Sequence, residues 1–369
     1  MKIKNLLVMS AVLACGLTLA SCDEPSTSQG GNNSNPSTGG TTTVEKLSVG
    51  LGYAGSFAIA EDGTAQFDLN AGMVAFNEDG TIADARIDVV QVKVKANEAG
   101  DGLALNQKAT ELDANGAIKS KLEQGKDYGM YPASWGSQLA EVDVQIEAFC
   151  DWTVGQTVEE VKAKIDPTKG HGTAHHEELE GLVTISCQSF VEVLEVAYAN
   201  RTEAVYEADE FTTGIGIVAG LAYNYGKPFV DISVDIAGAI VEGGKVVAAQ
   251  TDAIVYQTTV AEGVITSKAN SQYVSAEGKT VSKKALGDAY AMKGTENSDG
   301  TVCTLEWYEQ AELMELAAEG KTHEEIATLT KNTGDFAGVT ITCDNYVKAL
   351  AEAAKYADME YVGPQHEAQ

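Results

Sequence analysis

An alternation of apolar and polar side chains is the clearest pattern in the chain. It runs through residues 229–236 and is typical of a half-buried β-strand. The Gly243–Gly244 pair that follows predicts a tight hairpin turn into a second strand at residues 245–248. Residues 77–80 predict a similar turn in the first half of the chain. Each half is therefore expected to begin with antiparallel strands.

Helical periodicity replaces this alternation later in each half. Four apolar residues share one face of a predicted helix that ends at Gly320: Trp307, Ala311, Met314 and Ala318. Residues 322–325 have the sequence of a capping box, which predicts the start of a short helix. Residues 344–354 predict a last amphipathic helix with Asp344 as its N-cap. Strands followed by helices indicate the α+β fold class.

The chain contains an internal repeat with an offset near 165 residues. Five pairs of segments match: 50–52 with 214–216, 71–74 with 237–240, 120–121 with 282–283, 128–130 with 290–292, and 155–161 with 320–326. Each copy ends in a β-branched run, at residues 183–187 and 339–343, which predicts a short strand leading into an amphipathic helix. We therefore predict two tandem homologous domains, residues 46–200 and 210–358, followed by a tail at residues 359–369.

The beginning of the chain has the features of an exported lipoprotein. A short basic segment precedes an apolar run at residues 6–19, which is too short to span a membrane. Residues 19–22 resemble the bacterial lipobox, so we expect a signal peptide over residues 1–22 and a lipid on Cys22. Residues 23–45 are rich in Ser, Thr, Gly, Asn and Pro, which predicts a disordered tether. The expected location is the extracytoplasmic face of the cell membrane, with lipid as the only anchor.

The charge of the chain is strongly acidic. It has 54 acidic against 25 basic residues and a formal net charge of −29. Nucleic acid is therefore not an expected partner, because phosphates need clustered Lys and Arg. We interpret the excess of carboxylates as a solvated surface that keeps an exported protein soluble.

The cysteines and histidines leave alternatives open. Four cysteines follow the lipobox: Cys150, Cys187, Cys303 and Cys343. Export permits disulfides within each half, and buried thiols are the alternative. Residues 171–178 gather three of the five His with two Glu, which could bind zinc or copper or could form a solvated loop. The cluster lies in an insertion that the second copy lacks.

Motifs for catalysis are absent from the sequence. Residues 50–55 fit G-x-G-x-x-G, but strands rather than a helix are predicted after them, so they indicate a glycine-rich strand and not a dinucleotide site. There is no Ser/His/Asp, P-loop, H-E-x-x-H or EF-hand pattern, and a hydrolase is unsupported. An electron carrier or a binding module is the expectation rather than an enzyme.

The end of each copy resembles the FMN-binding domain family, which includes tandem-domain bacterial surface lipoproteins of extracellular electron transfer. The hallmark of that family resembles D-x-V-S-G-A-T before an amphipathic helix. Gly338 and Thr340 match this motif, whereas Asp335 lies one position too close. In the first copy only Thr184 matches. The segments 128–130, 290–292 and 306–310 are also similar to lipoproteins of this group.

This resemblance implies a function. It implies FMN esterified through its phosphate to Thr340, and in the first copy to Thr184. Trp307 could stack on the isoalloxazine ring, or it could be a core residue of its helix. The protein would then carry electrons between a membrane donor and an external acceptor. The alternative is a flavin-free surface lipoprotein that uses the same duplicated fold for binding or interaction.

Overall fold

A computed structural model describes residues 45–132, 139–170, 172–202, 206–208, 210–223, 229–296, 300, 302–331 and 334–357. All of these residues belong to one compact unit. The predicted signal peptide, the lipidation site Cys22, the tether up to residue 44 and the tail at residues 359–369 lie outside the described residues. The structure consists of antiparallel sheets and helices, as the α+β prediction requires.

Two antiparallel sheets form the centre of the molecule, one from each half of the chain. The first sheet has the order β4-β3-β2-β1-β5: β1 (Glu45–Ile59), β2 (Ala65–Asn77), β3 (Ile82–Ala96), β4 (Leu103–Leu105) and β5 (Tyr206–Ala208). The second has the order β6-β7-β8-β9: β6 (Phe211–Tyr223), β7 (Phe229–Glu242), β8 (Lys245–Ala261) and β9 (Val264–Ser267). The predicted hairpin around Gly243–Gly244 is the β7–β8 turn, and both glycines have positive φ.

The helices follow the strands in the same order in both halves. The first half has α1 (Lys121–Gln124), α2 (Val142–Thr153), α3 (Val158–Lys164) and α4 (Gln188–Ala199). The second half has α5 (Lys283–Leu286), α6 (Trp307–Ala318), α7 (His323–Ile326) and α8 (Asp344–Ala357). Short 3-10 helices lie between them: η1 (Ala109–Glu111), η2 (Gly125–Tyr128), η3 (Glu177–Leu179), η4 (Gly287–Tyr290) and η5 (Gly334–Phe336). The helices predicted from periodicity at residues 307–318 and 344–354 are confirmed, but Asp344 is the first residue of α8 and not its N-cap.

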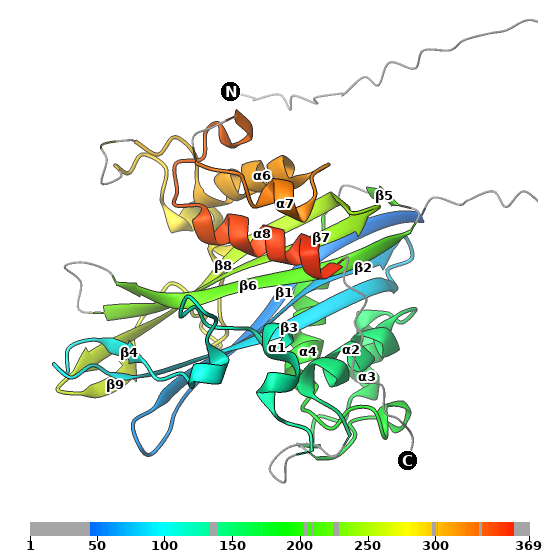
Figure 1. The fold of residues 1–369 in the computed structure, drawn as a ribbon, viewed down its shortest axis with the longest axis horizontal. Coiled ribbons are helices and arrows are strands. Elements are labelled where there is room, and N and C mark those ends of the chain that lie inside the picture. The colour runs from blue at the N-terminus through cyan, green and yellow to red at the C-terminus, as the bar shows by residue number, and fades with distance from the viewer. Residues whose placement is uncertain are drawn as a thin grey trace, which may run out of the picture. The chain divides into compact units, whose positions relative to one another are not determined.

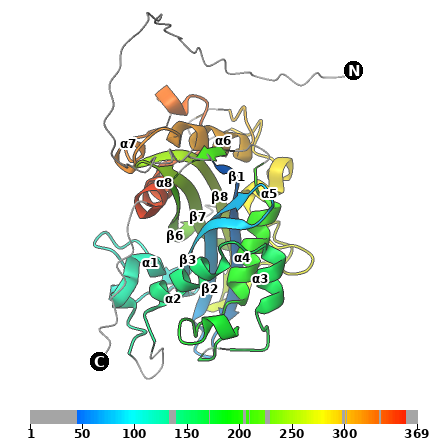
Figure 2. The same cartoon turned by 90° about the vertical axis from the view of Figure 1, so that its right-hand side faces the viewer.

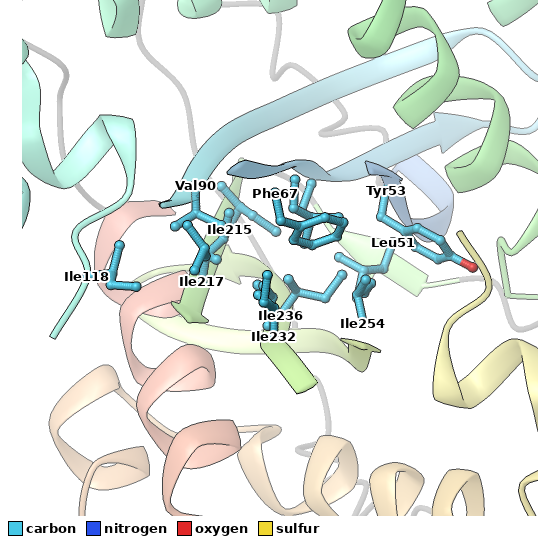
Figure 3. Packing of buried hydrophobic residues seen from close by; sticks show 14 of the residues in the cluster. Leu51, Tyr53, Phe67, Val90, Ile118, Ile215, Ile217, Ile232, Ile236 and Ile254 are labelled. Carbon is cyan, nitrogen blue, oxygen red and sulfur yellow. The ribbon is translucent and has the colours of Figure 1, made fainter. Parts of the chain in front are cut away.

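The two sheets pack face to face between two layers of helices. The helices α2, α3 and α4 lie on one side and α6, α7 and α8 on the other (Figures 1 and 2). A single hydrophobic cluster contains residues of both sheets. Figure 3 shows side chains of the two sheets that point toward one another: Leu51, Phe67 and Val90 from the first, and Ile215, Ile236 and Ile254 from the second. Each sheet forms a further cluster with its own helices.

Glycines in the first strand of each sheet let a helix approach closely. A Cβ added to Gly52 in β1 would lie 1.9 Å from the Val193 carbonyl oxygen of α4. A Cβ added to Gly216 in β6 would lie 2.0 Å from the Ala349 carbonyl oxygen of α8. These positions therefore require glycine for packing, and residues 50–55 lie within a strand, as the sequence predicted.

The strand register corrects one match between the two halves. Gly52 pairs with Gly72, whereas Gly216 pairs with Ala237, so Gly72 corresponds to Ala237 and not to Gly238. A Cβ on Gly238 would instead meet the Met73 side chain of the other sheet, at 2.6 Å from its sulfur. The match of residues 71–74 with 237–240 was therefore wrong by one position. Since successive side chains in a strand point to opposite faces, this one-position error assigned each residue to the wrong face of the sheet.

Candidate ligand-binding cavities

A fully buried glutamine holds the segment that precedes the last helix of each half. The Gln145 side-chain oxygen accepts hydrogen bonds from the Thr184 backbone N–H at 2.7 Å and from the Thr184 hydroxyl at 3.1 Å. In the second half, the Gln310 oxygen accepts from the Thr340 N–H at 2.7 Å, the Thr340 hydroxyl at 3.2 Å and the Ile341 N–H at 3.1 Å. Both glutamines have no exposed surface.

These bonds explain why the predicted terminal strands do not form. Residues 183–187 and 339–343 belong to no sheet, although their side chains alternate between buried and more exposed positions. Since Gln145 and Gln310 already accept from these N–H groups, the segments need no neighbouring strand. The strand prediction was therefore wrong here, whereas the amphipathic helices α4 and α8 that follow are confirmed.

A cavity of about 440 Å³ lies beside Thr184 in the first half. Its walls combine apolar side chains with hydrogen-bonding groups: Ser56, Asp68, Asn70, Val89, Gln91, Lys121, Tyr128, Met130, Val142, Gly172, Thr184, Ile185, Ser186, Ser189 and Phe190. This size and this mixture are typical of a site for a small molecule.

A lysine that forms no ion pair in the described part of the chain lies in this cavity, and the Asp68 carboxylate of the same wall is within electrostatic reach of it. The Lys121 ammonium is 5.1 Å from the centre of the Tyr128 ring, and burial lowers the pKa of Lys121. In the described part of the chain, no carboxylate forms an ion pair with it, although the protein carries a net charge of −29. The ammonium is therefore positioned to meet an anionic or electron-rich group of a ligand.

Buried carboxylates hold the backbone next to Lys121 and the backbone that follows Tyr128. Asp88 in β3 is buried and accepts a hydrogen bond at 3.0 Å from Leu122 N, next to Lys121 at the start of α1. Glu141 accepts from the N–H groups of Met130 and Tyr131 at 2.9 and 3.0 Å, which holds the segment that follows Tyr128. The second half repeats both contacts, with Asp252 bonded to Lys284 N and Glu306 bonded to Met292 N and Lys293 N.

The corresponding cavity of the second half has a volume of about 580 Å³. It is lined by Ala222, Asp231, Ser233, Val255, Gln257, Lys268, Asn270, Gln272, Tyr273, Lys283, Tyr290, Ala291, Met292 and Thr295. The Lys283 ammonium lies 5.7 Å from the centre of the Tyr290 ring and 5.6 Å from that of Trp307. This arrangement corresponds to Lys121 over Tyr128.

The residues proposed from the sequence lie at different distances from these cavities. Thr184 lines the first-half cavity, whereas Thr340 is not among the residues that line the second. Trp307 is 1% exposed and packs edge-on against Tyr346, with 5.7 Å between the ring centres. Gly338 has a positive φ of 96°, which favours glycine. Asp335 contributes backbone to η5, and its side chain lies outside the described part.

The cysteines and the histidine cluster take structural positions. Cys150, Cys187, Cys303 and Cys343 are all buried, and burial raises the pKa of Cys150 and of Cys187 to about 12. The proposal of a solvated loop fails at His175, which is 2% exposed because its segment folds back on Asp166 with a backbone bond of 3.1 Å. His171 lies outside the described residues. Within the described ranges, no group of three or more His, Cys, Asp or Glu is placed to hold a metal ion.

Several residues of the cavities were not singled out from the sequence. The roles of Gln145, Gln310, Lys121 and Lys283 became evident only in the structure. The sequence did contain a signal, since both halves keep Lys and Gln at matching positions.

Comparisons with known proteins give no relative from which a function could be transferred. A scan against protein-family models, a search of curated proteins and a search of solved structures each found no match. Among the helices of the described residues, none is long and apolar enough to cross a membrane.

Proposed function

We propose that this protein is a lipid-anchored, extracytoplasmic binding protein that holds a flavin, FMN, in the cavity of its first half and carries electrons with it. The observation that carries the proposal is the Lys121 ammonium, which lies against Tyr128 inside a cavity of about 440 Å³ and forms no ion pair among the described residues. The lipid anchor is inferred from the lipobox at Cys22, and a membrane electron donor is the implied partner.

The residues of this cavity fit the parts of FMN. The isoalloxazine ring is flat and has an electron-rich edge, which suits Tyr128, Phe190 and the Lys121 ammonium. The N-terminus of α4 suits the phosphate, because the Cys187 side chain accepts no capping hydrogen bond there and the first N–H groups of a helix attract anions. When bound, the flavin would supply the redox chemistry. The protein would hold the ring, shield it from water and stabilise its negative charge.

Thr184 is the better-placed attachment point. It lies on the cavity wall, four residues before α4. The sequence motif favours Thr340, but Thr340 is not among the residues lining the second-half cavity. We therefore favour Thr184 for a covalent bond to FMN and treat Thr340 as the competing position.

We also infer that the two halves arose by duplication of one α+β domain. Three sets of contacts recur at matching positions and support this inference. They are the Gln145–Thr184 and Gln310–Thr340 bonds, the Glu141 and Glu306 bonds, and the lysine–tyrosine pairs. Such recurrence is difficult to explain if the halves have separate origins.

Intact-mass measurement tests the flavin proposal. The full-length protein is produced in a bacterial host that contains the flavin transferase, and its mass and visible absorption are recorded. We expect one FMN adduct and a yellow protein, with the adduct lost in Thr184→Ala and kept in Thr340→Ala. Lys121→Met is expected to retain the adduct but to lower the reduction potential, because a positive charge near the ring stabilises reduced flavin.

Two results would contradict this assignment. Loss of the adduct only in Thr340→Ala would move the flavin to the second half. The second is a wild-type protein that is colourless, carries no adduct and does not quench the fluorescence of added free FMN. This result would rule out flavin binding. The alternative function, a flavin-free surface binding module, would then remain.

A further inference from the structure

The insertion of the first half that carries the histidine cluster lines a cavity of its own. This cavity has a volume of about 820 Å³, and His175, Glu177 and Glu180 of the insertion form part of its wall. It adjoins the first-half cavity, because Gly172 and Thr184 line both. The flavin proposal gives no role to His175, Glu177 or Glu180, and none of the three is among the residues that line the first-half cavity.

One ring nitrogen of His175 is bonded and the other is not. The residue is 2% exposed, and its Nδ1 lies 3.2 Å from the Asp166 carbonyl oxygen. Because a carbonyl oxygen can only accept, Nδ1 carries the hydrogen of the neutral ring, and Nε2 is left as an acceptor. Nε2 is buried and has no hydrogen-bond partner among the described residues. Buried polar atoms are normally bonded, so a donor from a ligand in this cavity would complete the hydrogen bonding of His175.

The charged groups around this cavity favour a cation. Glu177 and Glu180 are exposed at its wall, and neither forms an ion pair in the part of the chain that the structure describes. Lys169 is the lysine of the wall, and Asp166 of the same wall lies within electrostatic reach of it. Two carboxylates of the wall therefore remain available to a positively charged ligand, on a protein whose net charge of −29 already attracts cations.

We propose that this cavity binds a small organic amine in its ammonium form. An N–H of the ammonium donates to His175 Nε2, and Glu177 and Glu180 stabilise its charge. The apolar side chains of Leu139 and Ala174 line the same cavity and can contact the carbon chain of the amine. A metal ion fits less well, because no group of three or more His, Cys, Asp or Glu is placed to hold one within the described residues.

Isothermal titration calorimetry with the full-length protein separates the two contacts. Near neutral pH, butylamine carries a positive charge and N–H donors, butyltrimethylammonium keeps the charge without the donors, and butanol keeps a donor without the charge. We expect butylamine to bind at least about tenfold more tightly than either of the other two. Equally tight binding of butyltrimethylammonium, or no binding of butylamine, would overturn the proposal. Binding of Zn²⁺ without binding of butylamine would assign the cavity to a metal ion instead.

Matched substitutions locate the site. His175→Phe keeps a ring but removes Nε2, so we expect the preference for butylamine over butyltrimethylammonium to disappear. The double variant Glu177→Gln, Glu180→Gln is expected to weaken both cations about two- to tenfold, since exposed charges contribute little each. The double variant Glu78→Gln, Glu159→Gln removes the same charge from exposed positions outside the cavity and should leave both affinities unchanged.

Thermal unfolding confirms that each variant is folded before titration. An unchanged preference for butylamine in a folded His175→Phe would refute His175 as the acceptor. Equal weakening by the two double variants would show that only the overall charge of the protein attracts the cation, which also refutes the site. If His175→Phe does not fold, the comparison of the three probes on the wild type still decides the proposal. These results are independent of whether the first half carries flavin, because the substituted residues do not line the first-half cavity.

Discussion

The stability of this protein is expected to fall as the pH rises from 5 to 8, which is opposite to the trend of most salt-bridged proteins. The reason is a buried carboxyl group, Asp88, which is 1% exposed at the junction of β3 and α1. Burial raises the pKa of Asp88 from 3.8 to about 7. The folded protein therefore binds a proton that the unfolded chain releases above pH 4.

The size of the effect follows from this difference in pKa. A difference of about 3 pKa units corresponds to about 4 kcal/mol of unfolding free energy, at about 1.4 kcal/mol per unit. This contribution is fully present below the unfolded pKa and is lost as the pH rises through the folded pKa near 7. Glu352 of α8, which lies within electrostatic reach of Asp88 and Glu123, also has its pKa raised to about 7, mainly by burial. The two groups titrate as a coupled pair, so their contributions do not simply add.

Urea denaturation at pH 5, 6, 7 and 8 measures this slope, and Asp88→Asn isolates its main source. Asparagine keeps a side-chain oxygen to accept from Val89 N and Leu122 N but cannot ionise. We expect the wild type to lose at least about 2–4 kcal/mol of unfolding free energy between pH 5 and 8, and the variant to lose less. Asp252, whose pKa burial raises to about 6, and Glu352 leave a residual slope in the variant. The curves should meet near pH 5 and separate at pH 8, where the variant is more stable.

Two results would refute this reasoning. The first is a wild-type stability that rises over this range, which would show that Asp88 ionises in the folded protein near its ordinary pKa. The second is an equal slope in Asp88→Asn and wild type, which would assign the pH dependence to other groups. Acidic residues with a lowered pKa do not contribute to the slope between pH 5 and 8, because they are already ionised at pH 5.

Two further substitutions test the packing and the hydrogen bonds on which the cavities depend. Gly52→Ala would place a Cβ 1.9 Å from the Val193 oxygen, so we expect a loss of at least about 2 kcal/mol in urea denaturation. Gly220→Ala is the control, since a Cβ there has open space, and equal stability of the two variants would contradict the close packing. Gln145→Leu leaves the partly buried Thr184 N–H without its acceptor and is expected to cost about 1–3 kcal/mol, measured in the same way. If Gln145→Leu is as stable as the wild type, water replaces the glutamine as the acceptor.

The local elements could be read from the sequence where one pattern dominated. The alternation at residues 229–236 and the Gly243–Gly244 turn produced β7 and β8 as predicted, because strand period and turn chemistry agree there. The run at residues 339–343 has equally good strand residues and is not a strand. The Thr340 and Ile341 N–H groups of this run donate hydrogen bonds to Gln310, which is about 30 residues away in the sequence. The intrinsic strand preference of these residues cannot show that an acceptor so distant in the sequence binds their N–H groups.

The candidate site could be predicted only in part. The matching segments 128–130 and 290–292 indicated a region that matters in both halves, and the structure places both at cavity walls. The lysines were visible as a repeated Ser–Lys pair, but their place beside an aromatic ring at a cavity wall is a property of three-dimensional packing. Among the described residues neither Lys121 nor Lys283 forms an ion pair, although carboxylates act on both electrostatically.

The face-to-face packing of the sheets follows from residues on both faces of the long strands. In β2 and β8 most positions are buried, so neither face of these strands is free for solvent. Helices of the same half cover one face only. The other face needs a second sheet, and the second half supplies one with the same apolar surface. The Tyr53 hydroxyl also accepts from Ser282 N across this junction. Each half thus covers the sheet of the other, and the two halves form one unit because each buries the inner face of the other.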